Sequence, residues 1–471
     1  MMNQINDTGV LSSQLSKVSN KYKSYTINNF RKIPQIADNF SDEELFEMEV
    51  VATVLPFKSN NYVVNELINW DKPRKDPIFN LTFPNRSMLK GHHFDMLAER
   101  MKFGADKAEI ESIARKIRME LNPHPAGQSK LNLPRINGNV VEGMQHKYDH
   151  TALFFPKQGQ TCHAYCTFCF RWPQFVSTDE LKFATKDIEN SIAYFRANPQ
   201  ITDILFTGGD PMVMSPRHFA QYIDALIDAK LPNLQNIRIG SKSLAYWPQT
   251  FLEEDGDIIL GAFKRAISEG KHIAFMAHFN HHVELTTPAV QEAIQKINAT
   301  GARIRTQSPV FKNINDDPKV WSAMWKEQVR QGCIPYYMFV ARDTGAQHYF
   351  AVTLERAWKI FREAYQNVSG LARTVRGPSM SCTPGKVQIL GVVEVAGEKV
   401  FALRFLQGRN KNWIHRPFFA KYNPDAIWID DLEPAFGEEK FFFEEELEFK
   451  YKSIFRHEDI DDYIGVNYSQ N

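Results

Sequence analysis

The sequence predicts an α/β fold, a partial (β/α)6 barrel resembling a TIM barrel, between a helical N-terminal region and a C-terminal α+β extension. From residue 151 onward, short apolar runs alternate six times with longer segments of helical periodicity. Right-handed crossovers between such parallel strands curl a sheet towards a barrel. The 471 residues, 43% of them hydrophobic, suffice for one large core. We expect three regions, 1–140, 141–372 and 373–471.

Charge and hydropathy limit the class of protein. The 56 Lys and Arg balance 55 Asp and Glu, so the formal charge is +1 and we expect no nucleic-acid partner and no membrane. The apolar runs are shorter than the 18 residues of a membrane span, and the N-terminus lacks the apolar segment of a secretion signal. We therefore expect a soluble cytoplasmic protein, and a homo-oligomer, because closed homo-oligomers are common among soluble proteins.

The N-terminal region contains two helix signals. Ser41 precedes three acidic residues, which is a helix-start signature and predicts a helix over 41–53. Apolar residues at helical spacing predict a second helix over 107–121. Between them, the proline-rich residues 71–86 suggest an irregular connection.

Six strand and helix pairs follow. The expected strands are 152–155, 203–207, 236–240, 272–277, 303–307 and 336–340. The expected helices are near 185–196, 216–229, 257–268, 288–299, 319–331 and 354–365. The region from residue 373 opens with loop sequence, and we interpret its acidic, Phe-rich stretch 438–448 as a solvated helix face or a partner-contacting tail.

Five cysteines, an odd count with three inside eight residues, do not form a disulfide framework. Cys162, Cys166 and Cys169 follow the first expected strand, at the rim where barrel enzymes place their chemistry. Thiolates prefer zinc or iron–sulfur clusters. A closed zinc site needs a fourth ligand, for which only His163 is adjacent. A cluster with three cysteines leaves one iron open to a ligand.

The CxxxCxxC spacing, with Phe168 before its last cysteine, resembles the radical S-adenosylmethionine (SAM) superfamily. This resemblance implies a 4Fe-4S cluster on the three cysteines, whose open iron binds the amino and carboxylate groups of S-adenosyl-L-methionine. Gly208, Gly209 and Asp210 end the second strand, where glycine allows close backbone approach, and alone they indicate only a tight turn. After the cysteines they resemble the segment that holds the methionyl amino group, and Ser241 is assigned to the same cofactor.

Eight further motifs lie between His146 and Leu403 in the order seen in lysine 2,3-aminomutases, a family that the chain resembles over more than half its length. They are His146-Lys-Tyr, Cys169-Phe-Arg171, Thr207-Gly-Gly-Asp-Pro, Ile237-Arg-Ile-Gly-Ser241, His278-Phe-Asn-His281, Thr306-Gln-Ser308, Asn315-Asp316 and Pro335-Tyr-Tyr337. The resemblance implies an isomerase that depends on pyridoxal 5′-phosphate (PLP). In that family a 5′-deoxyadenosyl radical removes hydrogen from Cβ and the amino group moves from Cα to Cβ. A flavodoxin or ferredoxin would supply the electron.

The resemblance also assigns roles to single residues. Lys386 ends a loop that matches the PLP-lysine loop, although a longer segment replaces the polyglycine run, so an ordinary loop lysine remains an alternative. Lys147 matches the first of two phosphate-binding arginines, with His150 or Thr151 at the second. Arg171 matches the arginine that pairs with the substrate α-carboxylate, and its alternative is a surface arginine.

The substrate pocket departs most from the family. Its two aspartates against the distal ammonium group fall here on Arg342-Asp343 and on Arg376. Two arginines would suit an anionic or neutral distal group, because a buried like-charge pair is costly, whereas an inward Asp343 would keep half of the lysine pocket. We hypothesise a small-molecule amino acid substrate other than lysine.

Several side chains and two other functions stay open. His278, His281 and His282 are interpreted as lining the cofactor pocket, because they lack the carboxylate pattern of a zinc site. Cys333 is expected in the core, and Cys382 in a loop or the pocket. The alternatives are a radical SAM enzyme without PLP and a zinc-stabilised non-catalytic protein.

Overall fold

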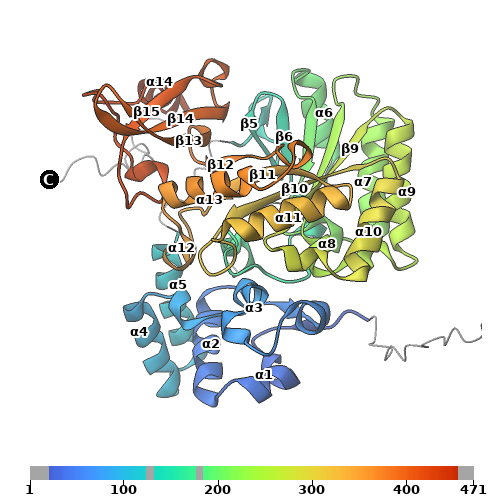
Figure 1. Ribbon diagram of the computed structural model, residues 1–471. Coiled ribbons are helices and arrows are strands. Elements are labelled where there is room, and N and C mark those ends of the chain that lie inside the picture. The colour runs from blue at the N-terminus through green and yellow to red at the C-terminus, as the bar shows by residue number, and fades with distance from the viewer. Residues whose placement is uncertain (1–20, 123–131, 177–183, 455–471) are drawn as a thin grey trace, which may run out of the picture.

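The N-terminal helices form a layer beneath the sheet in a computed structural model that describes residues 21–122, 132–176 and 184–454 (Figure 1). Ser41 caps α2 by accepting from the Glu44 backbone nitrogen, while the Glu44 side chain accepts from Ser41 in return. The two predicted helices are confirmed as α2 and α5. The layer contains α1 (Pro34–Asn39), α2 (Asp42–Val54), α3 (Pro77–Thr82), α4 (Gly91–Lys102) and α5 (Lys107–Glu120).

The prediction of an irregular connection over residues 71–86 is wrong, because helix α3 lies within these residues. Asp76 caps this helix by accepting from the Phe79 nitrogen at 2.7 Å. Pro77 occupies the first helical turn, where its missing N–H costs nothing, so this proline starts a helix where we had expected a break.

Eleven strands form one mixed sheet in the described part of the chain, ordered β15-β14-β13-β12-β11-β10-β9-β8-β7-β6-β5. Strands β6 to β12 run parallel, and the remaining pairs are antiparallel. The six predicted strands are confirmed as β6 to β11. The bounds are β5 (Met144–Tyr148), β6 (Thr151–Phe154), β7 (Asp203–Phe206), β8 (Asn236–Ser241), β9 (His272–His278), β10 (Arg303–Val310), β11 (Ile334–Val340), β12 (Arg376–Ser381), β13 (Gly385–Val395), β14 (Glu398–Gly408) and β15 (Pro417–Lys421). Two further pairs are β1 (Ser24–Tyr25) with β2 (Ser59–Asn60) and β3 (Arg135–Ile136) with β4 (Asn139–Val140).

The six predicted helices are confirmed as α6, α7, α9, α10, α11 and α13. The remaining bounds are α6 (Glu189–Ala197), α7 (Pro216–Asp228), α8 (Ser243–Tyr246), α9 (Gly256–Ser268), α10 (Pro288–Ala299), α11 (Pro318–Arg330), α12 (Gln347–Phe350), α13 (Leu354–Gln366) and α14 (Glu444–Ile454). The acidic stretch 438–448 includes the start of α14, beside β13 to β15 (Figure 1). Phe441 and Phe443 of this stretch are buried, so its apolar side is docked on the chain itself.

The two faces of the sheet differ in character. On β8, Ile237 and Ile239 are fully buried, whereas Arg238 and Gly240 keep partial exposure. The buried face packs on helices, as Phe206 of β7 does against Phe219 of α7. The opposite, inner face is partly accessible, with leucines on β6 and β7 and with Arg238 on β8.

The sheet is strongly curled. Lys147 on β5 donates from Nζ to the carbonyl oxygen of Cys382, just after β12, at 2.6 Å. Seven inter-strand steps separate β5 from β12 in the strand order, which would be about 30 Å in a flat sheet. The inner face is thus enclosed. In the ranges that the structure describes, no helix has both the length and the apolarity needed to cross a membrane.

Candidate active site

The three clustered cysteines occupy a loop after β6. Burial raises the pKa of each thiol, that of Cys169 to about 12. No three ligand atoms among Cys162, His163, Cys166 and Cys169, all described, lie within 4.8 Å of one another. Tetrahedral zinc with Zn–S bonds of about 2.3 Å would bring sulfurs to about 3.8 Å. These ligand atoms are therefore not gathered as one zinc ion requires, and three cysteines in one loop suit a cluster in which each cysteine binds its own iron.

Two glycines support this loop from β7. A Cβ on Gly209 would lie 2.6 Å from the Thr161 nitrogen, and one on Gly208, whose φ is +134°, would lie 2.7 Å from Gln160 Oε1. The Asp210 nitrogen donates to the Thr161 carbonyl at 2.7 Å. Because glycine has no Cβ, these two residues can pack closely against the cysteine loop.

Asp210 and Ser241 join the ends of β7 and β8. The buried Asp210 carboxylate accepts from Ser241 Oγ at 3.0 Å and from the Lys242 nitrogen at 2.8 Å. Burial raises the pKa of Asp210. The two residues assigned to SAM from the sequence thus contact each other beside the cysteine loop.

The N-terminal layer holds the same loop from the other side. Lys58 Nζ donates to the Cys162 carbonyl at 2.8 Å. Tyr22 Oη donates to the His163 carbonyl at 2.7 Å, and Asn60 Nδ2 donates to it at 3.2 Å. No motif in the sequence indicated these contacts.

Aromatic side chains border the cysteines. Tyr246 Oη lies 3.4 Å from Cys166 Sγ, and burial raises the pKa of Tyr246 well above its usual value, so its hydroxyl stays a donor. The Phe168 ring packs against Phe311 at 4.0 Å and against His278 at 5.7 Å. Nε2 of His278 is buried and has no hydrogen-bond partner in the structure. These contacts place His278 beside the cysteine loop.

Arg171 lies next to Cys169 with its guanidinium 4.6 Å from the Phe155 ring centre. Burial, and after it Arg342, lower the pKa of Arg171 to about 10, against the raising influence of Cys169. Its Nη1 is buried without a hydrogen-bond partner in the structure. An unpaired buried guanidinium N–H is costly, so this atom is suited to a carboxylate ligand.

Lys386 on β13 extends over the ring of Tyr337, 4.1 Å from Nζ to the ring centre. Burial first, then Arg238 and Arg376, lower the pKa of Lys386 to about 7. The lowered pKa favours the uncharged amine near neutral pH, and this is the form that reacts with a carbonyl group.

Lys147 interacts electrostatically with both Lys386 and Arg342. Burial lowers the pKa of Lys147 well below its usual value, and Arg409, Arg342 and Lys386 add to this effect. Arg342 in turn interacts electrostatically with Arg171, and Arg171 with Cys169, so a row of electrostatic interactions links Cys169 to Lys386.

The remaining residues singled out from the sequence are dispersed. Arg342 stacks on Phe170 at 4.9 Å, and Asp343 interacts electrostatically with it. Arg376 lies instead over Tyr336, at 4.7 Å. His146 on β5 is hydrogen-bonded to Tyr194 on α6, and His150, in the turn after β5, to the carbonyl of Gln200 in the loop after α6. Cys333 is buried in the core, as expected, and Cys382 is buried beside Lys147.

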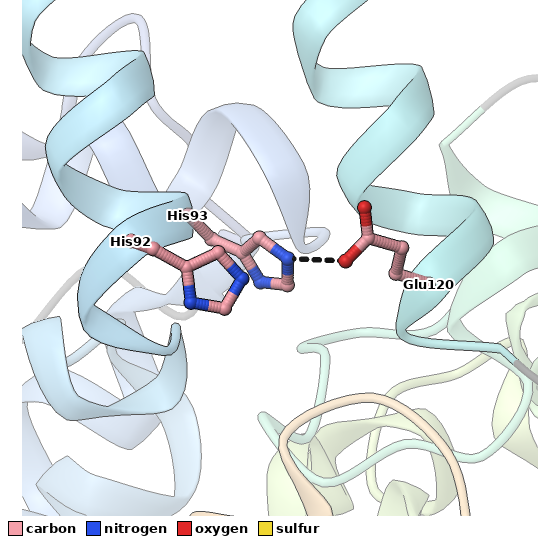
Figure 2. A group of neighbouring side chains, drawn as sticks. All are labelled: His92, His93 and Glu120. Atoms are coloured by element: carbon pink, nitrogen blue, oxygen red, sulfur yellow. Dashed lines mark hydrogen bonds and ion pairs between the residues drawn. The ribbon is translucent and has the colours of Figure 1, made fainter.

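One group of potential metal ligands lies elsewhere, at the N-terminal layer (Figure 2). His93 Nε2 is 2.7 Å from Glu120 Oε2, and His92 stands beside the His93 ring. The Glu120 side chain is 63% exposed. A hydrogen bond joining α4 to α5 accounts for this arrangement.

Known proteins with a similar sequence include several 2,3-aminomutases. No family model matches the chain. Over 405 residues it is 31% identical to a protein of Aquifex aeolicus assigned as an L-lysine 2,3-aminomutase. This match covers 86% of this chain and 94% of that protein. The chain is 28% identical to an L-lysine 2,3-aminomutase of Haemophilus influenzae, covering 53% of this chain and 72% of that protein. Glutamate 2,3-aminomutase of Clostridioides difficile is 26% identical, with coverages of 45% and 47%. Among solved structures, a radical SAM methyltransferase from Sphaerobacter thermophilus aligns at 11% identity and a TM-score of 0.37, covering 61% of this chain and 93% of that one.

Proposed function

The chain belongs to the lysine 2,3-aminomutase family and is an enzyme of the isomerase class, and on this premise we propose that it is a radical SAM, PLP-dependent amino acid 2,3-aminomutase. The observation that carries the proposal is that the curled sheet bears the cysteine loop with the buried, unpaired Nη1 of Arg171 on one side and the Lys386 amine over Tyr337 on the other. We also propose that residues 141–372 form a partial (β/α)6 barrel of the radical SAM type, with 1–140 and 373–471 as flanking regions. The curled parallel strands and the Lys147 contact with Cys382 support that architecture.

Cys162, Cys166 and Cys169 would hold the 4Fe-4S cluster, with SAM at the open iron near Phe168, the two glycines, Asp210 and Ser241. The unpaired N–H of Arg171 and the uncharged amine of Lys386 fit a carboxylate and a carbonyl partner. When bound, the cluster with SAM supplies the 5′-deoxyadenosyl radical, and PLP stabilises a radical on the substrate.

The chain's own residues position and shield the reacting groups. Lys386 presents its amine against the rings of Tyr337 and Phe339, which limit water at that atom. Arg171 would orient the substrate α-carboxylate beside the cysteines, because a planar guanidinium binds a carboxylate in a fixed geometry.

The substrate would have an anionic or neutral distal group. Arg342 joins Arg171 and Lys147 in the row, and Asp343 is the carboxylate that interacts with Arg342. A distal ammonium group would add a further positive charge there. A glutamate aminomutase among the relatives supports testing acidic amino acids first.

The first experiment is anaerobic purification followed by assay of iron, sulfide, zinc and PLP on one sample. We expect about four irons per chain and a PLP adduct that borohydride fixes to Lys386 and that Lys386→Ala abolishes. Iron without PLP would favour the second candidate, a radical SAM enzyme without PLP. Zinc alone would overturn both candidates.

The substrate proposal has its own test. Loaded enzyme would be incubated with glutamate, aspartate, alanine and lysine, and β-amino products measured by mass spectrometry. Conversion of lysine to β-lysine at a normal enzymatic rate would refute the claim that the substrate is not lysine.

A further inference from the structure

Two arginines on the inner face of the sheet share one tyrosine ring. The guanidinium carbons of Arg305 on β10 and Arg376 on β12 lie 5.3 and 4.7 Å from the ring centre of Tyr336. Nη1 of Arg376 also lies 3.4 Å from the hydroxyl of Tyr337. Stacking on an aromatic ring limits the orientations of a guanidinium, so both groups are partly preorganised.

The charge around these arginines is unbalanced. Arg238 on β8 is the third cation, and it lies 3.8 Å from Asp203. Arg305 and Arg376 make no ion pair with any described residue. Arg238 also interacts electrostatically with Tyr337 and Lys386. Four basic groups thus lie about the tyrosines, and Asp203 is the carboxylate paired with one of them among the described residues. Like charges held together in a partly buried space repel, and a bound anion would relieve this repulsion.

We propose that Arg238, Arg305 and Arg376 form an oxyanion site that takes the phosphate of PLP attached at Lys386. This inference rests on the proposed function. The site adjoins the anchor, because Arg376 and Lys386 both contact Tyr337, at 5.4 and 4.1 Å. Planar guanidinium groups match the geometry of phosphate oxygens.

Lys147, the phosphate ligand expected from the sequence, is poorly suited to that role. Its Nζ donates to the Cys382 carbonyl, and burial lowers its pKa well below the usual value. A lysine also lacks the planar fork with which a guanidinium binds phosphate oxygens.

A substrate carboxylate has the same oxyanion chemistry, but two observations favour the phosphate. Arg171, at the cysteine side, already offers an unpaired N–H for a carboxylate. The phosphate carries more negative charge than a carboxylate, so it balances the excess of cations better.

The test compares PLP with pyridoxal, which lacks the phosphate, on the full-length chain. Dissociation constants would be measured from the absorbance of the Schiff base, after borohydride labelling of Lys386 has been verified in the wild type. We expect Arg305→Gln and Arg376→Gln each to reduce the preference for PLP over pyridoxal about tenfold or more. Arg362→Gln, an exposed arginine on α13, is the matched control and should leave the preference unchanged.

Each other outcome overturns a defined claim. An unchanged preference in variants with wild-type circular dichroism overturns the phosphate site. A loss of preference confined to Lys147→Met would place the phosphate at Lys147 instead. Weaker binding of acidic amino acids with an unchanged preference would assign the arginines to the substrate. Absence of labelling at Lys386 in the wild type would overturn the PLP-dependent function itself.

Discussion

Replacing Lys386 by methionine should remove a rise of stability with pH. Burial, Arg238 and Arg376 lower the pKa of this amine from 10.5 to about 7 in the folded chain. Below pH 7 the amine is charged in both folded and unfolded states, so the folded state bears the full cost of the buried charge. Above pH 7 the folded state releases the proton while the unfolded state keeps it until about pH 10.5, so the free energy of unfolding increases.

The size of the stability change follows from the interval between the folded and unfolded pKa values of Lys386. Each pH unit between the two pKa values contributes about 1.4 kcal/mol, so the range from pH 7 to pH 9 contributes at most about 3 kcal/mol. This is an upper value because the side chain keeps partial contact with solvent.

The assay is chemical denaturation of PLP-free protein at several pH values between 6 and 9. Lys386→Met should be more stable than the wild type at pH 6, and the difference should shrink as the pH rises. Lys326→Met, an exposed lysine on α11, is the control and should run parallel to the wild type. Parallel curves for Lys386→Met and the wild type would show that Lys386 titrates as an ordinary lysine and would refute the reasoning.

Three further predictions concern the cysteine loop. Lys58→Met should lower the iron retained per chain, measured colorimetrically after anaerobic gel filtration, because the Cys162 carbonyl loses its ammonium donor; equal retention would contradict this. Tyr246→Phe should make the cluster potential more negative in an EPR-monitored titration, because a hydrogen bond to Cys166 stabilises the reduced cluster. An unshifted potential at full iron content would contradict it. Gly209→Ala should destabilise the chain by about 1–3 kcal/mol in thermal melts, since its Cβ would meet the loop backbone. A melting temperature equal to that of the wild type would refute this close packing.

The six pairs of strand and helix could be predicted because their sequence signals are local. Each of the six parallel strands is a short apolar run, and each following helix repeats its apolar residues on one side. Helix α2 could be predicted from the residues of its own cap. The connection around α3 could not, because proline both breaks helices and starts them, and the choice depends on Asp76 and on burial of the helix.

The site could be predicted only in part. The cysteine spacing is a local pattern, and Lys386 is predicted by resemblance. The support from Lys58, Tyr22 and Asn60 involves residues more than a hundred positions away in the chain, so no spacing encodes it. Arg238 and Arg305 had a usable signal, since both alternate with buried residues on their strands, Arg238 with Ile237 and Ile239 and Arg305 with Ile304 and Thr306.

That alternation bears on what the inner face can bind. Arg171 and Arg342 lie beyond the carboxyl ends of the strands, whereas Arg238, Arg305 and Arg376 lie in the first halves of their strands. Lys386 is paired near the carboxyl end of β12 and extends back to Tyr337, so it stands between the two groups of arginines. A molecule held beside Lys386 would therefore meet positive charge at both of its ends. An adduct of PLP with an acidic amino acid is anionic at both ends, whereas lysine would direct an ammonium group at one of them, and the repulsion there would disfavour binding.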